Sequence, residues 1–89
     1  MAITSGQINI TPSAAIIIHE DTDGCEAIIT NGGSYDVMLG NESVTKNDGF
    51  ILKPLAIVSM ILGPNEPVYG VANQGEASKI SYLLTKNNN

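Results

Sequence analysis

The middle of the chain, residues 34–73, reads SYDVMLGNESVTKNDGFILKPLAIVSMILGPNEPVYGVAN. It contains four short apolar runs, at residues 35–39, Phe50–Leu52, 55–62 and Val68–Ala72, separated by clusters of Gly, Pro, Asn and Asp. Runs of this length between such clusters are typical of β-strands joined by tight turns. The stretch therefore predicts strands, with no segment of helical period.

The run at residues 55–62 differs from the run at residues 35–39. In the earlier run, Val37 and Leu39 share one face while Asp36 and Met38 share the other, which is the alternation of a half-buried strand. In residues 55–62 both faces are apolar, and Ser59 is the single polar residue. A strand of this kind is expected at the centre of a protein or against a second protein.

The remaining chain carries similar runs at residues 7–10, 14–18, 25–30 and 79–85. Strands at intervals of about ten residues predict an all-β fold, a two-layer antiparallel β-sandwich of seven or eight strands. The spacing fits immunoglobulin-like and jelly-roll connectivity equally well. We expect residues 1–11 to form an N-terminal arm and first strand, residues 12–86 the sandwich domain, and residues 87–89 a disordered tail.

Composition restricts the classes of function. The chain has 89 residues, a formal net charge of −5 and a single cysteine, Cys25. A domain of this size buries only about 60–65% of its unfolded surface and is therefore marginally stable, and a single Cys25 cannot form an intrachain disulfide. Self-association is the expected source of additional stability. The negative charge repels phosphate and anionic lipid, so neither nucleic-acid nor membrane binding is expected.

The polar clusters do not form a recognisable catalytic or metal-binding motif. His19, Glu20, Asp21 and Asp23 lie close together, but their spacing departs from that of a calcium loop, so a solvated hairpin turn is expected. Cys25 has only His19 as a possible base, so an inert buried thiol is expected in place of a nucleophile. We therefore predict no catalytic residue, no metal and no cofactor, and a protein that is not an enzyme.

Several motifs resemble those of small β-sandwich virion proteins of tailed bacteriophages. They are Asp36-Val37-Met38-Leu39-Gly40, Val44-Thr45, Gly49-Phe50-Ile51-Leu52-Lys53-Pro54, Val68-Tyr69-Gly70-Val71-Ala72 and Gly75-Glu76-Ala77. A similar order of motifs recurs in capsid decoration and head-fibre proteins, and the resemblance covers residues 36–83. It implies a virion component that binds the outside of an assembled head, often as a symmetric oligomer.

The leading hypothesis is therefore a capsid decoration, or cement, protein. Its expected partners are further copies of itself in a homotrimer and the major capsid protein, on the exterior of the virion after synthesis in the bacterial cytoplasm. Five residues are expected in the core or in self-association: Ile16, Ile18, Leu55, Ile57 and Ile61. Four are expected to contact the capsid: Ala2, Ile3, Ile8 and Ile10.

Two other functions stay open. One is a receptor- or glycan-binding module of a phage fibre or tail, which predicts exposed aromatic residues in the loops at one end. The three tyrosines, Tyr35, Tyr69 and Tyr82, are instead expected within strands. The other is a bacterial adhesion or pilus subunit, which the lack of a visible secretory signal disfavours.

Overall fold

The computed structural model describes residues 2–19 and 24–86, and this part of the chain contains eight β-strands and no helix. The strands are β1 (Ala2–Ile10), β2 (Ala15–Ile18), β3 (Cys25–Asn31), β4 (Val37–Gly40), β5 (Phe50–Leu52), β6 (Ile57–Leu62), β7 (Val68–Ala72) and β8 (Ser78–Lys86). The predicted all-β class is confirmed. No described segment is a helix long and apolar enough to cross a membrane.

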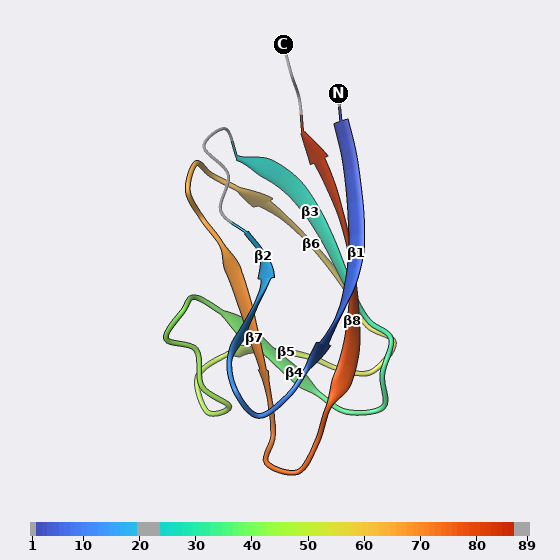
Figure 1. Cartoon of the computed structure of the whole chain (residues 1–89), viewed down its shortest axis with the longest axis vertical. Helices are drawn as coiled ribbons and strands as arrows, with labels where there is room; N and C mark the ends of the chain where they lie inside the picture. The colour runs from blue at the N-terminus through green and yellow to red at the C-terminus, as the bar shows by residue number, and fades with distance from the viewer. Residues whose placement is uncertain (1, 20–23, 87–89) are drawn as a thin grey trace.

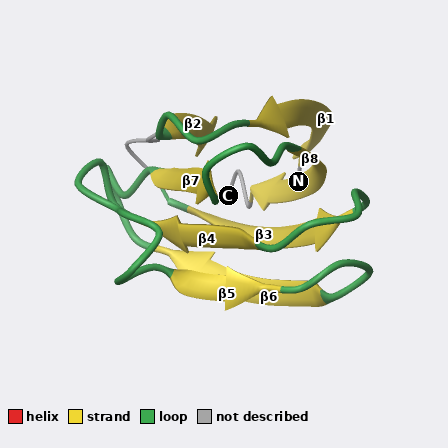
Figure 2. Cartoon of the chain, turned by 90° about the horizontal axis from the view of Figure 1, so that it is seen from below, coloured by secondary structure: helices red, strands yellow, loops and turns green. Residues whose placement is uncertain are grey.

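The strands form two antiparallel sheets of four strands each (Figures 1 and 2). The strand order is β1-β8-β3-β6 in sheet A and β2-β7-β4-β5 in sheet B. Most connections cross from one sheet to the other, and only the β4–β5 connection stays within a sheet. This is the strand order of an eight-stranded jelly roll, so the structure decides between the two connectivities that the sequence left open.

The N-terminal residues belong to the sandwich. β1 pairs with β8 along its whole length, from Ala2 opposite Lys86 to Ile10 opposite Ser78. The first and last strands consequently run side by side in Figure 1. Residues 2–10 are therefore an integral strand of sheet A, where the sequence suggested a partly separate arm, and the expected tail at 87–89 lies outside the described residues.

Aliphatic side chains from both sheets fill the space between them. The core includes Ile10, Ile18, Ile29, Val37 and Ile80, each with at most 1% of its surface exposed. β-Branched side chains dominate because they are stiff and pack well on a pleated surface. This single layer of side chains shields the inner face of each sheet.

The chain itself covers part of the outer face of sheet B, although Ile51 of β5, opposite Met38, remains 53% exposed. Met38 of β4 and Val71 of β7 lie opposite each other on that face. Val44, from the connection between β4 and β5, packs against both of them, with Tyr69 at the margin. Val44 is only 7% exposed, so this otherwise polar loop is packed onto sheet B through its one apolar side chain.

One buried polar side chain, that of Asn31 at the end of β3, ties the two sheets together. Its Nδ2 donates to the carbonyl oxygens of Tyr35 (2.7 Å) and Leu52 (2.9 Å). Its Oδ1 accepts from the backbone N–H of Gly33 (3.0 Å) and from the hydroxyl of Ser78 (2.7 Å). The full hydrogen-bonding capacity of the amide is therefore used, and β3 is fixed to β5 and β8 at one end of the sandwich.

Removing this amide is expected to be costly. We predict that Asn31→Ala lowers the free energy of unfolding by about 2–4 kcal/mol, because it leaves several buried polar groups without partners. Urea denaturation measures the change. Asn41→Ala, which removes an exposed acceptor for the Ser43 N–H, is the matched control and is expected to cost less than about 1 kcal/mol. Equal effects of the two substitutions would contradict the role assigned to Asn31.

Candidate interaction surface

The outer face of sheet A carries apolar side chains that stay exposed. The strand register arranges this face in three rows across the sheet: Ile3, Thr85, Glu26 and Ile61; Ser5, Leu83, Ile28 and Ser59; Gln7, Ser81, Thr30 and Ile57. Ile3 is 69% exposed, Ile57 68% and Ile61 82%. Glu26 is the one charged residue in these rows. The next row of the same face carries Asn9 and Lys79. The face therefore carries few charges, and its five aliphatic side chains are interspersed with polar ones.

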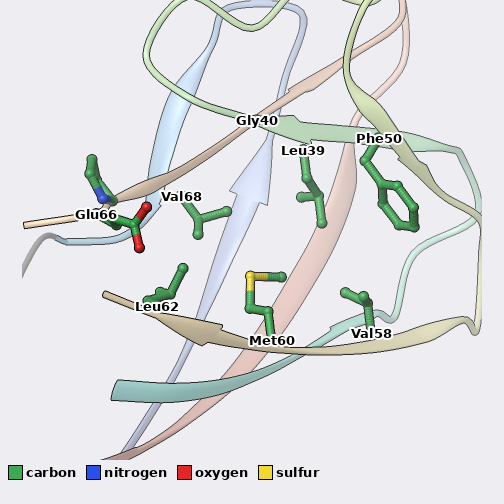
Figure 3. Close-up of a pocket in the computed structure, with 9 residues that line it drawn as sticks. Leu39, Gly40, Phe50, Val58, Met60, Leu62, Glu66 and Val68 are labelled. Carbon is green, nitrogen blue, oxygen red and sulfur yellow. The ribbon is translucent and has the colours of Figure 1, made fainter. Parts of the chain in front are cut away.

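One lateral edge of the sandwich, which we call the open side, is formed by β5 and β6. Figure 2 shows these two strands together at one end of both sheets, with β1 and β2 at the opposite end. Between the sheets at the open side lies an apolar groove of about 370 Å³. Val58, Met60 and Leu62 project into it from β6 toward side chains of sheet B, among them Leu39, Phe50 and Val68 (Figure 3).

The chemistry of this groove favours apolar occupants. Glu66 is the charged residue at its margin, and its Oε1 already accepts a hydrogen bond from the Gly63 N–H. Among the described residues that line the groove, none carries a positive charge. Such a lining can hold aliphatic or aromatic groups but offers no cation to a phosphate.

The turn that leads into β6 places a leucine where backbone geometry favours glycine. The Ala56 N–H donates to the Lys53 carbonyl (3.0 Å), which closes a turn with Pro54 and Leu55 at its centre. Leu55 has a φ of 67° and an exposed fraction of 81%. Proline followed by a residue with positive φ is the pattern of a type II turn, which normally has Gly or Asn at the second position. Elsewhere in the described chain, positive φ values fall on residues that tolerate them: Gly24, Asn65 and Gly75.

Leu55 is thus unfavourable in its own fold for two reasons. A left-handed backbone costs a non-glycine residue about 1–2 kcal/mol, and the side chain gains little from burial within the chain. Strained residues of this kind are concentrated at functional sites. The conformation therefore makes Leu55, beside the exposed side chains of β6, a candidate contact residue.

The structure separates the residues that the sequence grouped for core or self-association. Ile18 is in the core, and Ile16 is half-buried on β2 opposite Tyr69. Leu55, Ile57 and Ile61 are exposed at the open side and on the outer face of sheet A. The sequence left two locations for residues 55–62, the centre of this fold or a contact with a second protein. The structure excludes the centre of the fold for the outward side chains, and contact with a second protein stays a prediction.

The predicted capsid-contact residues are also divided. Ile3 lies exposed on the outer face of sheet A, whereas Ile10 has no exposed surface and Ile8 packs against the core. The assignment of Ile8 and Ile10 is corrected, since alternation along β1 directs these two side chains inward. The side chain of Ala2 lies outside the described part.

The clusters weighed for metal binding and nucleophilic chemistry are only partly described. His19 is exposed after β2, and Glu20, Asp21 and Asp23 lie outside the described residues. Cys25 is half-buried at the start of β3, less enclosed than expected. Within residues 2–19 and 24–86, no group of three or more His, Cys, Asp or Glu side chains is arranged to hold a metal ion.

Sequence reasoning missed several members of the exposed surface. Ile28, Leu83 and Phe50 are 43%, 39% and 62% exposed. A signal existed for Ile28, which alternation places on the same face as Glu26 and Thr30. Only the order of strands in sheet A shows that Ile28 lies between Leu83 of β8 and Ser59 of β6.

The fold and this surface define an eight-stranded jelly roll with one uncovered sheet face. No protein-family model matches the sequence, and no curated protein matches it either. Solved structures match in fold. A cupin-superfamily sugar phosphate isomerase from Silicibacter pomeroyi has a TM-score of 0.63 at 10% identity, over 96% of this chain and 51% of that one.

Two further structures share the fold. A protein described as a putative mannose-6-phosphate isomerase from Ralstonia eutropha has a TM-score of 0.59 at 8% identity, over 96% of this chain and 75% of that one. RmlC from Streptococcus suis, solved with dTDP-D-xylose, has a TM-score of 0.54 at 13% identity, over 98% of this chain and 45% of that one. This chain spans about half the length of the Silicibacter protein, and identities this low show the fold alone.

The prediction that the chain is not an enzyme is corrected by these comparisons. The same two-sheet architecture is found in proteins described as sugar phosphate isomerases, so this fold supports enzyme active sites. The prediction relied on missing sequence motifs and on a structural-protein resemblance. Neither constrains what a jelly roll can host, because function depends on sites that vary within a fold.

Replacing Leu55 tests whether it serves its own fold. We predict that Leu55→Asn raises the free energy of unfolding of the dilute protein by about 0.5–1 kcal/mol, because Asn tolerates positive φ and little burial is lost. Asn65→Leu, the reverse exchange at a φ of 62°, is the control and is expected to cost about 1 kcal/mol. A loss of stability in Leu55→Asn would show that Leu55 packs within the chain.

Proposed function

We propose that the protein is a structural component of a tailed-phage particle, which decorates the outside of the head and bridges neighbouring capsid subunits. The outer face of sheet A is the observation that carries the proposal. It presents Ile3, Ile28, Ile61 and Leu83 beside two charged side chains, Glu26 and Lys79, while the Val44 loop covers part of the outer face of sheet B. Contiguous apolar surface on a small folded domain marks a site of protein contact.

Two further properties support the proposal. Eight-stranded jelly rolls recur among viral capsid proteins, as they do among lectins and cupins. The net charge of −5 suits the exterior of a shell better than an interior filled with nucleic acid. The proposed location is accordingly the virion exterior, after synthesis in the bacterial cytoplasm.

Self-association is part of the proposal. A cement protein acts by repetition, since many modest contacts over a shell add up to a large avidity. The homotrimer that the phage resemblance implies stays a prediction. The major capsid protein is the proposed second partner, through the outer face of sheet A.

A receptor- or glycan-binding module is the second candidate. Tyr35 was expected within a strand, but it precedes β4 and is 46% exposed, and Phe50 is 62% exposed. Exposed aromatic rings are the usual platforms for sugar binding. This candidate predicts that the protein binds isolated glycans and ignores heads.

Binding to heads separates the two candidates. The test uses heads of the phage that encodes the chain, assembled in its absence. The purified chain is expected to bind these heads saturably, at fixed exterior positions that cryo-electron microscopy can show. We predict that Ile28→Lys combined with Leu83→Lys, two neighbours on the outer face of sheet A, weakens this binding at least about tenfold. Asn47→Lys, in the exposed loop over sheet B, is the control and should bind as the unmodified chain does. Binding to a glycan array with none to heads would overturn the proposal.

A further inference from the structure

We infer that the chain pairs with a second copy of itself through the free edge of β6, which joins two copies of sheet A into one continuous eight-stranded sheet. The inference rests on the self-association in the proposed function and names its contact, and it replaces the homotrimer that the phage resemblance implies with a two-fold pair. It arises from an edge strand that has no protection, from the direction of its main-chain groups, and from the apolar groove beside it. β1, the other edge of sheet A, also lacks charge and proline, but the pocket at its side of the sandwich includes His19 and Lys86.

β6 lacks the devices that keep edge strands from pairing. Natural edges are protected by short length, bulges, charges or proline. β5 has three residues and is followed by Lys53 and Pro54, and β2 has four residues with a register shift between Ile16 and Ile18. β6 has the six residues IVSMIL, without charge or proline. A free strand of this composition is an aggregation hazard unless a defined partner covers it.

The main-chain groups of β6 alternate in direction. The Asn31 N–H donates to the Ala56 carbonyl (3.1 Å), and the β3–β6 register continues from this pair. In an antiparallel ladder, every second residue bonds to a given neighbour. The residues that bond to β3 are therefore Val58, Met60 and Leu62. Those that direct N–H and C=O groups into the open side are Ile57, Ser59 and Ile61.

These outward residues are complementary to their own copies. With Ser59 opposite the partner's Ser59, Ile57 lies opposite the partner's Ile61, and Ile61 lies opposite the partner's Ile57. The three pairs then exchange about six main-chain hydrogen bonds, which is the full capacity of this edge. The paired side chains share the outer face, with β-branched residues facing each other and small hydroxyls at the two-fold axis.

The second layer of the sandwich supports the same arrangement. A two-fold axis through Ser59, perpendicular to sheet A, brings the open sides together, so that the two apolar grooves face each other. Phe50 and Met60, which line each groove, then contribute to one shared core. A contact of about six residues along β6 and two sheets deep buries on the order of 1,000 Å² in total, which is about the minimum for a specific interface.

Charge also favours a second copy at this side. Each chain carries a net charge of −5, so two copies repel each other over most of their surfaces. β6 is uncharged along its whole length, and repulsion is therefore weakest where the edges meet. The symmetry is isologous, and the assembly closes at two copies.

A cross-linking experiment tests the pairing and its register. In a Cys25→Ser background, Ser59→Cys is expected to form an intermolecular disulfide on mild oxidation, giving a species of twice the 9.3 kDa chain mass. The expected Cα separation of about 5.5 Å suits such a bond. Ser13→Cys, at an exposed position after β1, is the matched control and should remain at the single-chain mass.

A charge exchange at the axis gives an independent readout. Ser59→Lys and Ser59→Glu are each expected to sediment as single chains, and an equimolar mixture is expected to restore the dimer because opposite charges then face each other. Circular dichroism of each variant checks that the sandwich is folded. Three results would each overturn the pairing. They are dimers that persist in both separate variants, a mixture that fails to associate, and an unmodified chain that is monomeric or trimeric. Head binding is measured in a separate experiment. If the chain binds heads but does not pair through β6, this inference is refuted and the proposed function stands.

Discussion

One thin layer of side chains between two sheets can shield only half of the sheet surface. In this molecule Ile29, Val37 and Ile80 belong to that layer, and Asn31 locks the sheets in position at one end. The two outer faces need separate solutions. The Val44 loop covers part of sheet B, whereas sheet A has no such cover in the described chain, and the surface chemistry of sheet A follows from that difference.

The uncovered surface is continuous from the outer face of sheet A around to the open side. Ile57 and Ile61 belong to the face, their main-chain groups belong to the edge, and their neighbour Met60 lines the groove. Leu55 extends the same surface at the cost of a left-handed backbone. Burying an aliphatic side chain of this size contributes about 1.5–3 kcal/mol, so a partner that covers several of them offsets both the exposure and the strain. A small domain that is marginal alone thereby gains stability when it assembles.

The sequence predicted local structure well because local structure depends on neighbours in the chain. The bounds of β5 and β7 match the apolar runs between turn residues, and the alternation of Val37, Met38 and Leu39 separates core from outer face. Jelly-roll connectivity could not be predicted, since both candidate topologies share the same strand spacing. The two-faced run that contains β6 indicated a contact, but only the pairing of distant strands shows that it is an edge. The assignments of Ile8 and Ile10 failed because residues 1–11, expected as an arm and first strand, were given a capsid contact, whereas β8 pairs with residues 2–10 and alternation turns Ile8 and Ile10 inward. The exclusion of enzymes failed because missing motifs do not limit what a fold can support.

Amide hydrogen exchange along β6 tests the central claim most directly, since it reads each residue of the edge in the unmodified chain. Val58 and Met60, whose N–H groups face β3, should be protected at all protein concentrations. Ile57, Ser59 and Ile61 are predicted to exchange quickly in dilute protein and to become protected to a similar degree as the concentration rises. Fast exchange of these three amides at every concentration would contradict the claim that the edge of β6 is completed by another copy of the chain.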